Sequence, residues 1–139
     1  VESVPEAVEY LQNTDGNVLI ATGSKELKEY TRIAGCKERC YARVLSTQVS
    51  VEESIRLGFE GRHLIAMQGP FSKELNLAML RAVDARYFVT KESGKSGGFL
   101  EKVQAAEEAK AVLVVGRPFE VGKILKETKK FLEIWAGLC

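Results

Sequence analysis

The chain has 139 residues, of which 45% are hydrophobic and 28% are charged, so it has the size and apolar content of one globular domain. Its 20 basic and 19 acidic residues give a net charge of +1 without a long run of one sign, which argues against nucleic-acid binding through a basic face. No apolar stretch approaches the roughly 18 residues that a membrane-spanning helix needs, so we expect no membrane contact.

Helix and strand signals alternate along the chain, beginning with a helix. A serine followed three residues later by glutamate forms a capping box, and such boxes predict helix starts at Ser3 and Ser50. Ser24 and Ser72 are predicted to cap further helices, and Gly35 to end the helix that Ser24 begins. The predicted helices cover, in chain order, residues 3–12, 24–33, 50–58, 72–83, 99–111 and 121–135.

Short continuous apolar runs lie between these helices and are typical of strands that are buried on both faces of a sheet. The runs fall on residues 18–21, 41–45, 64–67, 87–90 and 112–115. Because strands that alternate with helices pair in parallel through right-handed crossovers, the sequence predicts a single doubly wound α/β domain over residues 1–139. We expect a Rossmann-like or flavodoxin-like parallel sheet of about five strands flanked by helices, in the order 2-1-3-4-5.

The segment from Thr90 to Gly98, rich in glycine, serine and lysine, joins the fourth predicted strand to the next helix. Glycines let backbone N–H groups approach an anion, the helix start adds a partial positive charge, and Lys91 and Lys95 would add full charges. The segment therefore indicates either an anion site or a turn that simply needs glycine. It is not a P-loop, because that motif requires glycine at the position of Val89, and no G-x-G-x-x-G dinucleotide motif occurs either.

Several polar residues directly follow predicted strands. The carboxyl ends of parallel strands meet at one edge of a sheet, and ligands of open α/β folds bind outside that edge. We therefore expect the following side chains to converge there: Thr22, Ser24, Gln68, Ser72, Lys91, Glu92, Ser93 and Arg117.

The cysteines of the chain, Cys36, Cys40 and Cys139, do not form the pattern of a disulfide framework. An odd number at this low density is typical of free thiols in a reducing compartment, so we expect a cytoplasmic protein. Cys36 and Cys40 bracket a charged turn, but a metal or redox pair would need further Cys or His residues nearby, and the only histidine is His63. We predict no metal site.

The runs TGSKEL, RVL, IAMQGPFSKELN, VTKESGKSGGFLEK and VVGRP lie between Val18 and Pro118. In combination they resemble the carboxyl-terminal lobe of the precorrin-6A and cobalt-precorrin-6A reductase family. Ser46 departs from the pattern, because proline is expected there. The resemblance implies two similar α/β lobes with the active site between them, and NADPH that reduces one double bond of a tetrapyrrole during cobalamin synthesis. It also implies that the amino-terminal lobe is a missing partner and that this chain alone is inactive.

The same resemblance implies which turns line the cleft between the lobes. For NADPH it implies contacts with Gly23, Ser24, Lys91, Ser93, Gly94 and Gly98. For the tetrapyrrole substrate it implies contacts with Thr22, Gln68, Ser72 and Arg117. Phosphates on the cofactor and carboxylates on the substrate would both suit lysine, arginine and helix starts.

The resemblance names no proton donor. Glu92 is one possibility, but we favour a structural partnership with Lys91 or Lys95 for its carboxylate. In the helix after the loop, Leu100 and Val103 are expected to face the core. Glu101 and Lys102 are expected to lie on a solvated face.

Two other functions remain open at this point. A flavodoxin-like module without its own catalysis would use the same sheet edge to bind a flavin or another nucleotide. A response-regulator-like domain would need acidic side chains at the strand ends to hold a metal ion, whereas the first strand is followed by Thr-Gly-Ser. The resemblance to the reductases makes hydride transfer the leading hypothesis.

Overall fold

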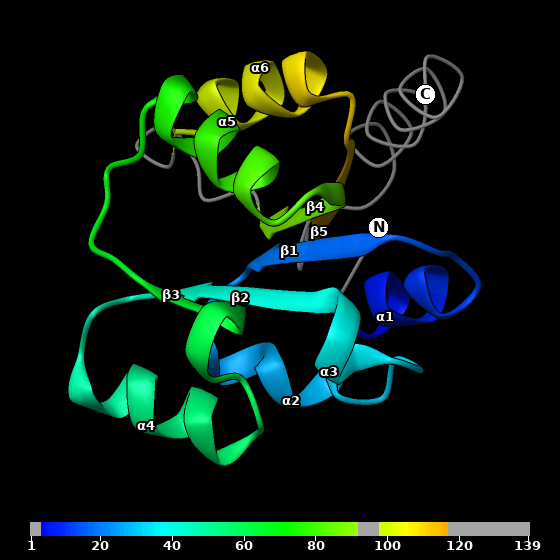
Figure 1. Cartoon of the computed structure of the whole chain (residues 1–139), viewed down its shortest axis with the longest axis vertical. Coiled ribbons are helices and arrows are strands. Elements are labelled where there is room, and N and C mark those ends of the chain that lie inside the picture. The colour runs from blue at the N-terminus through cyan, green and yellow to red at the C-terminus, as the bar shows by residue number, and fades with distance from the viewer. Residues whose placement is uncertain (1–3, 92–97, 117–139) are drawn as a thin grey trace.

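The computed structural model describes residues 4–91 and 98–116 of the chain. These residues form a five-stranded parallel sheet with helices on both faces (Figure 1). The predicted doubly wound α/β fold with a parallel sheet is therefore confirmed. The strands are β1 (Asn17–Ala21), β2 (Cys40–Val44), β3 (Leu64–Ala66), β4 (Ala85–Lys91) and β5 (Val112–Gly116).

The strand order is β3-β2-β1-β4-β5, so the predicted order 2-1-3-4-5 is wrong. β1 lies between β2 and β4, and its Leu19 is in register with Tyr41 on one side and Phe88 on the other. β3 is an edge strand of three residues, and none of them is fully buried. The chain thus reverses its direction of travel across the sheet between β1 and β4, which is where open α/β sheets bind ligands.

The helices divide into two layers. On one face lie α1 (Val4–Gln12), α2 (Leu27–Tyr30), α3 (Cys36–Arg39) and α4 (Gln48–Arg56), and on the other lie α5 (Lys73–Ala82) and α6 (Phe99–Ala109) (Figure 1). One apolar core joins the first layer to the sheet and includes Leu11, Ile20, Leu27 and Tyr30. A second core joins α5 and α6 to the opposite face and includes Leu80, Phe88, Ala106 and Leu113. None of the helices among the described residues is long and apolar enough to cross a membrane.

One predicted helix start is confirmed and another is wrong. Ser72 caps α5 as expected, since its Oγ accepts a hydrogen bond from the N–H of Leu75 at 3.1 Å. The capping box at Ser50 does not form, because Thr47 caps α4 instead and accepts from the N–H of Ser50 at 3.2 Å. Ser50 lies buried inside the helix. A cap three residues upstream therefore begins this helix earlier than the sequence pattern suggested.

The segment predicted as one helix over residues 24–33 is a 3-10 turn, Ser24–Glu26, followed by the short α2. Gly35 has a φ of 74° and ends that region in left-handed backbone, as predicted. The next four residues form α3, although the sequence indicated a turn there. Ser3 and the helix predicted over residues 121–135 lie outside the described residues.

Candidate functional site

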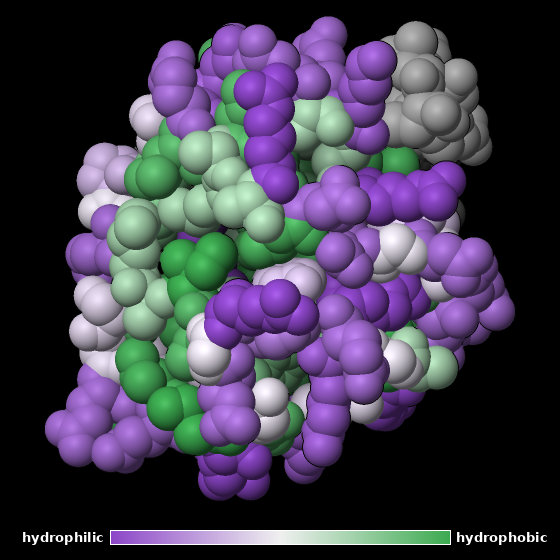
Figure 2. All heavy atoms as spheres, in the orientation of Figure 1, coloured by the Kyte–Doolittle hydropathy of each residue, from purple (hydrophilic) through white to green (hydrophobic). Residues whose placement is uncertain are grey.

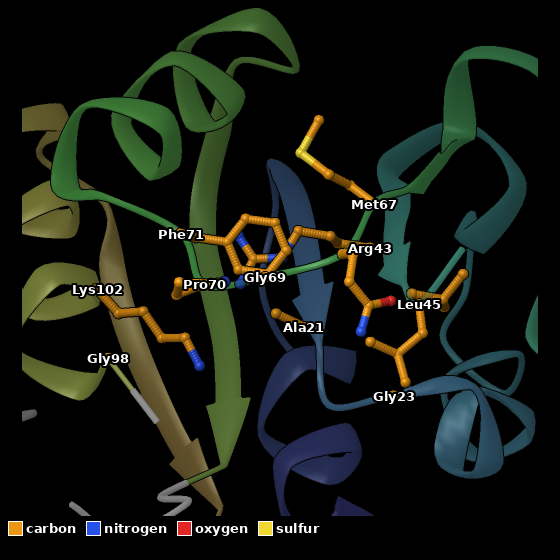
Figure 3. A pocket seen from close by; sticks show the side chains of 12 residues that line it. Ala21, Gly23, Arg43, Leu45, Met67, Gly69, Pro70, Phe71, Gly98 and Lys102 are labelled. Atoms are coloured by element: carbon orange, nitrogen blue, oxygen red, sulfur yellow. The ribbon is translucent and has the colours of Figure 1, made fainter. Parts of the chain in front are cut away.

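An open cleft of about 560 Å³ lies at the carboxyl edge of the sheet (Figure 3). It is bounded by Gly23 after β1, by residues 43–45 at the end of β2, by the loop 67–71 after β3, and by Gly98 and Lys102 of α6. The cleft is therefore formed by the ends of β1 and β2, the loop after β3 and the start of α6, and it lies at the edge where a parallel sheet binds its ligands.

The loop over residues 67–71 forms one wall of the cleft. Its first residue extends the sheet pairing, because the N–H of Met67 donates to the carbonyl oxygen of Val44 at 2.9 Å. The peptide bond between Gly69 and Pro70 is cis. A Cβ on Gly69 would lie 3.1 Å from Cε2 of Phe71, so a larger residue at this position would have to push the ring by a few tenths of an ångström.

Arg43 brings a buried guanidinium group from β2 into the cleft. Its side chain is 6% exposed. Nη1 donates to Oδ1 of Asn76 at 2.6 Å, and Cζ lies 3.9 Å from the centroid of the Phe71 ring. Figure 3 shows the Arg43 side chain beside the Phe71 ring. Burial lowers the pKa of Arg43 to about 10, so the group stays charged at neutral pH. An amide oxygen and an aromatic face thus take the place of a carboxylate partner.

Lys102 reaches the cleft from the opposite side, along α6. Its Nζ donates to Oγ1 of Thr90 at 2.9 Å, and Thr90 is completely buried at the end of β4. Burial, together with the charge of Arg43, lowers the pKa of Lys102 to about 8. The predicted solvated position of Lys102 is therefore wrong, because its side chain is largely buried and lines the cleft.

Hydrophobic side chains form the rim of the cleft. Leu45 is 50% exposed and Met67 is 36% exposed, although both are large and apolar. Figure 2 shows hydrophobic side chains gathered on the side of the molecule where β2 and β3 end, with hydrophilic side chains over much of the rest of this face. An apolar rim beside two cations suits a ligand that has both apolar surface and negative charge.

A family model described as Precorrin-6x reductase CbiJ/CobK matches residues 1–136. The chain belongs to this reductase family. Among its relatives, the cobalt-precorrin-6A reductase of Methanothermobacter thermautotrophicus is 50% identical over 82 residues, which cover 58% of this chain and 27% of that protein. The cobalt-precorrin-6A reductase of Priestia megaterium is 36% identical over 121 residues, which cover 85% of this chain and 48% of that protein.

A third cobalt-precorrin-6A reductase, from Methanocaldococcus jannaschii, is 45% identical over 97 residues, which cover 69% of this chain and 37% of that protein. The chain therefore spans about half the length, or less, of these three reductases. No solved structure matches the chain significantly. This family membership confirms the resemblance to the precorrin-6A and cobalt-precorrin-6A reductase family that the sequence indicated.

Three of the residues predicted to contact ligands of this reductase family lie in the cleft, namely Gly23, Gln68 and Gly98. Gly23 and Gly98 have φ values of 95° and 66°, which L side chains rarely adopt. No heavy atom lies within 4 Å of a Cβ built on Gly23, so its backbone is open to a ligand. Ser93, Gly94 and Arg117, and also Glu92 and Lys95, lie outside the described residues.

Three other predicted residues serve the protein's own structure. Thr22 is buried, and its Oγ1 lies 3.4 Å from the hydroxyl of Tyr30, while Ser24 Oγ lies 3.2 Å from Ser50 Oγ. Ser72 caps α5 and lines a second, shallow hollow beside the start of α6.

Lys91 does not line the cleft. Its Nζ forms an ion pair with Glu26, and the two side chains border a separate hollow next to the start of α1. The other carboxylate oxygen of Glu26, Oε2, is buried and has no hydrogen-bond partner among residues 4–91 and 98–116. The described structure thus assigns Lys91 an acidic partner of its own, and an anion would compete with Glu26 for it.

The cysteine pair of the chain, Cys36 and Cys40, lies at α3 and the start of β2, whereas the cleft lies at the other end of that strand. A hydrogen bond between the two thiols lowers the pKa of Cys36 and raises that of Cys40, which burial raises further. Within residues 4–91 and 98–116, no three His, Cys, Asp or Glu side chains gather in a way that could hold a metal ion.

Proposed function

We propose that this chain is the carboxyl-terminal lobe of a cytoplasmic, NADPH-dependent precorrin-6A or cobalt-precorrin-6A reductase of cobalamin biosynthesis. The observation that carries the proposal is the open cleft at the carboxyl edge of a parallel sheet, in a chain whose family model covers residues 1–136. The relatives named cobalt-precorrin-6A reductase are about twice as long or longer, which supports a second lobe that completes the cleft.

The residues of the cleft fit a phosphate-bearing cofactor and a carboxylate-bearing substrate. Gly23 offers an open backbone, and the start of α6 at Gly98 presents backbone N–H groups. Arg43 and Lys102 supply positive charge in a partly water-excluded place, where charge-assisted hydrogen bonds are strong. When bound, NADPH would supply a hydride, which with one proton saturates a double bond of the macrocycle. The chain's own contribution is to bind and orient these groups.

The assignment of NADPH to Gly23, Ser24, Lys91, Ser93, Gly94 and Gly98, and of substrate to Thr22, Gln68, Ser72 and Arg117, stays a prediction. Gly23, Gly98 and Gln68 are well placed for it. For Thr22, Ser24 and Ser72, a ligand would have to share hydroxyl groups that already make hydrogen bonds within the fold. Lys91 would have to exchange Glu26 for a phosphate.

A chimaera tests this function. The segment of the Priestia megaterium reductase that aligns with this chain would be replaced by the chain, and loss of NADPH absorbance would be followed with cobalt-precorrin-6A as substrate. We expect turnover by the chimaera and none by the isolated chain, because half of the cleft is missing from the latter. Robust turnover by the chain alone would contradict the lobe assignment. Flavin absorbance in the purified chain would instead support the flavodoxin-like alternative.

A further inference from the structure

Two largely buried cations, Arg43 and Lys102, face the cleft, and none of the described residues that line it carries a carboxylate. Figure 3 shows Arg43 extending from β2 and Lys102 from α6 toward the middle of the cleft, with the loop that carries Pro70 and Phe71 beside them. Both residues line the same cleft, and the positive charge of Arg43 helps to lower the pKa of Lys102.

The protein's own hydrogen bonds use only part of each cationic group. A guanidinium has five N–H donors, and in Arg43 only Nη1 has partners within the described chain, at 2.6 Å to Asn76 Oδ1 and 3.6 Å to Met79 Sδ. An ammonium has three donors, and Lys102 uses one of them on Thr90. Nε and Nη2 of Arg43 and two donors of Lys102 are thus left for a ligand.

More exposed cations of the described chain do have acidic partners. Arg32 pairs with Glu29 and Arg56 with Glu53, each through side chains that are at least one-third exposed. Burying a charge is costly unless it is paired. The buried Arg43 therefore needs an acidic partner more than the exposed Arg56 does. The structure has the opposite arrangement. Within residues 4–91 and 98–116, Arg43 and Lys102 therefore remain available to the negative charge of a ligand.

We propose that Arg43 and Lys102 together bind one oxyanion, a carboxylate or a phosphate, of the ligand that occupies the cleft. The planar Arg43 group would hold two oxygens side by side, and Lys102 would act as a point charge on the same anion. The Phe71 ring and Asn76 fix the plane of the guanidinium, and Thr90 fixes the ammonium. The site is therefore formed before the ligand arrives.

The inference rests on the proposed function for the identity of the anion, which would be a carboxylate of the tetrapyrrole or a phosphate of NADPH. Small probes test the site without that assumption. The 139-residue chain would be titrated calorimetrically with tricarballylate and with pyrophosphate, and then with a polycarboxylate porphyrin and with NADP. The variants are Arg43→Met and Lys102→Met. Arg56→Met is the matched control, because it removes one equally positive charge from an exposed side chain that does not line the cleft.

We expect each cleft variant to lower the affinity for the probes that bind there about ten- to a hundredfold, as for loss of a charge-assisted hydrogen bond. Arg56→Met should leave these affinities unchanged. Weakened tricarballylate and porphyrin binding with intact pyrophosphate and NADP binding assigns the anion to the substrate. The reverse pattern assigns it to the cofactor. If all four affinities are the same in wild type and in both cleft variants, the inference is wrong.

A second measurement covers the case in which a variant does not fold. In the wild-type chain, the pKa of Lys102 would be followed by NMR of its labelled ε-ammonium group, and a bound anion should raise it. If neither tricarballylate nor pyrophosphate changes the pKa of Lys102, the inference is wrong.

If the small anions bind through Arg43 and Lys102 but NADP and the porphyrin do not bind, the site stands and the proposed function fails. If NADP or the porphyrin binds equally well to wild type and to both cleft variants, the function stands and the site fails.

Discussion

The ε-ammonium group of Lys102 lies 2.9 Å from Oγ1 of Thr90, so the beginning of α6 is tied to the end of β4 by a hydrogen bond at the cleft. Thr90 is completely buried, which leaves its hydroxyl little freedom to turn away. Lys102 is consequently held in a place where its charge is poorly solvated and where Arg43 repels it. Its protonation should therefore be linked to the stability of the fold.

The first prediction concerns this linkage. The pKa of Lys102 is about 8 in the folded chain, whereas its ordinary value, which applies to the unfolded chain, is 10.5. Between about pH 8 and pH 10.5 the unfolded chain therefore binds more protons than the folded chain. The free energy of unfolding should therefore rise with pH through that window, and below about pH 8 the charged Lys102 should destabilise the fold. Lys102→Met should be more stable than wild type at pH 7 and should show a smaller rise. Urea unfolding at a series of pH values measures the free energy of unfolding at pH 7 and its rise with pH for each protein. Parallel curves for the two proteins would contradict the prediction.

A second prediction concerns Asn76, whose side-chain oxygen accepts the hydrogen bond from Arg43 at 2.6 Å inside the protein. Asn76→Ala removes the polar acceptor of a buried charge, and we expect the free energy of unfolding to fall by about 1–3 kcal/mol. Gln48→Ala is a suitable control, because it removes an exposed hydrogen bond to Glu52 and should change stability by less than about 0.5 kcal/mol. Equal losses in the two variants would show that Asn76 does not support Arg43.

Gly69 provides a third prediction. A Cβ at this position would crowd Phe71, whose ring lies over the Arg43 guanidinium. Gly69→Ala should therefore shift the ring and weaken oxyanion binding several-fold, with only a small change in stability because the loop is at the surface. Gly58→Ala is the contrasting variant. It has room for a Cβ but a φ of 100°, so it should lower stability and leave binding unchanged. If Gly69→Ala binds anions as wild type does, the Phe71 ring does not orient Arg43.

The fold class followed from the sequence because buried strands and capped helices are local patterns. The strand order did not follow, since an apolar run does not encode on which side of β1 a later strand will pair. The shortness of β3 and the exposure of Ala66 mark it as an edge strand, but these became visible only in the structure. The predicted and observed orders differ in the place of β3, which pairs with β2 at the edge of the sheet instead of lying between β1 and β4.

The site was predicted only in part. Glycines and polar residues after strands indicated Gly23, Gln68 and Gly98, which line the cleft. The sequence analysis missed Arg43. Its signal was a charged residue within a strand whose other residues are all buried. Lys102 was misplaced because Leu100 was expected to face the core. Leu100 is 62% exposed, whereas Val103 packs inward as predicted and does so together with Phe99. The buried face is therefore shifted toward Phe99, and Lys102 lies at the cleft.

The last prediction concerns Lys91, which the sequence assigned to a phosphate and which the structure pairs with Glu26. In the chimaeric reductase, Lys91→Ala should weaken NADP binding about tenfold if Lys91 exchanges its carboxylate for a phosphate during binding. Glu26→Gln is the matched variant, because it removes the competing charge and leaves Lys91 in place. It should leave NADP affinity unchanged or increase it, since Lys91 no longer has to leave a partner.

Calorimetric titration with NADP, alongside urea unfolding, separates this role from a structural one. An ion pair that serves only the fold would make both variants slightly less stable, by no more than about 1 kcal/mol for partly exposed side chains, and would leave NADP affinity at the wild-type value in each. That result would remove Lys91 from the cofactor site. A loss of NADP affinity in Lys91→Ala that Glu26→Gln does not share can arise only if the lysine acts on the ligand, because both variants break the same ion pair.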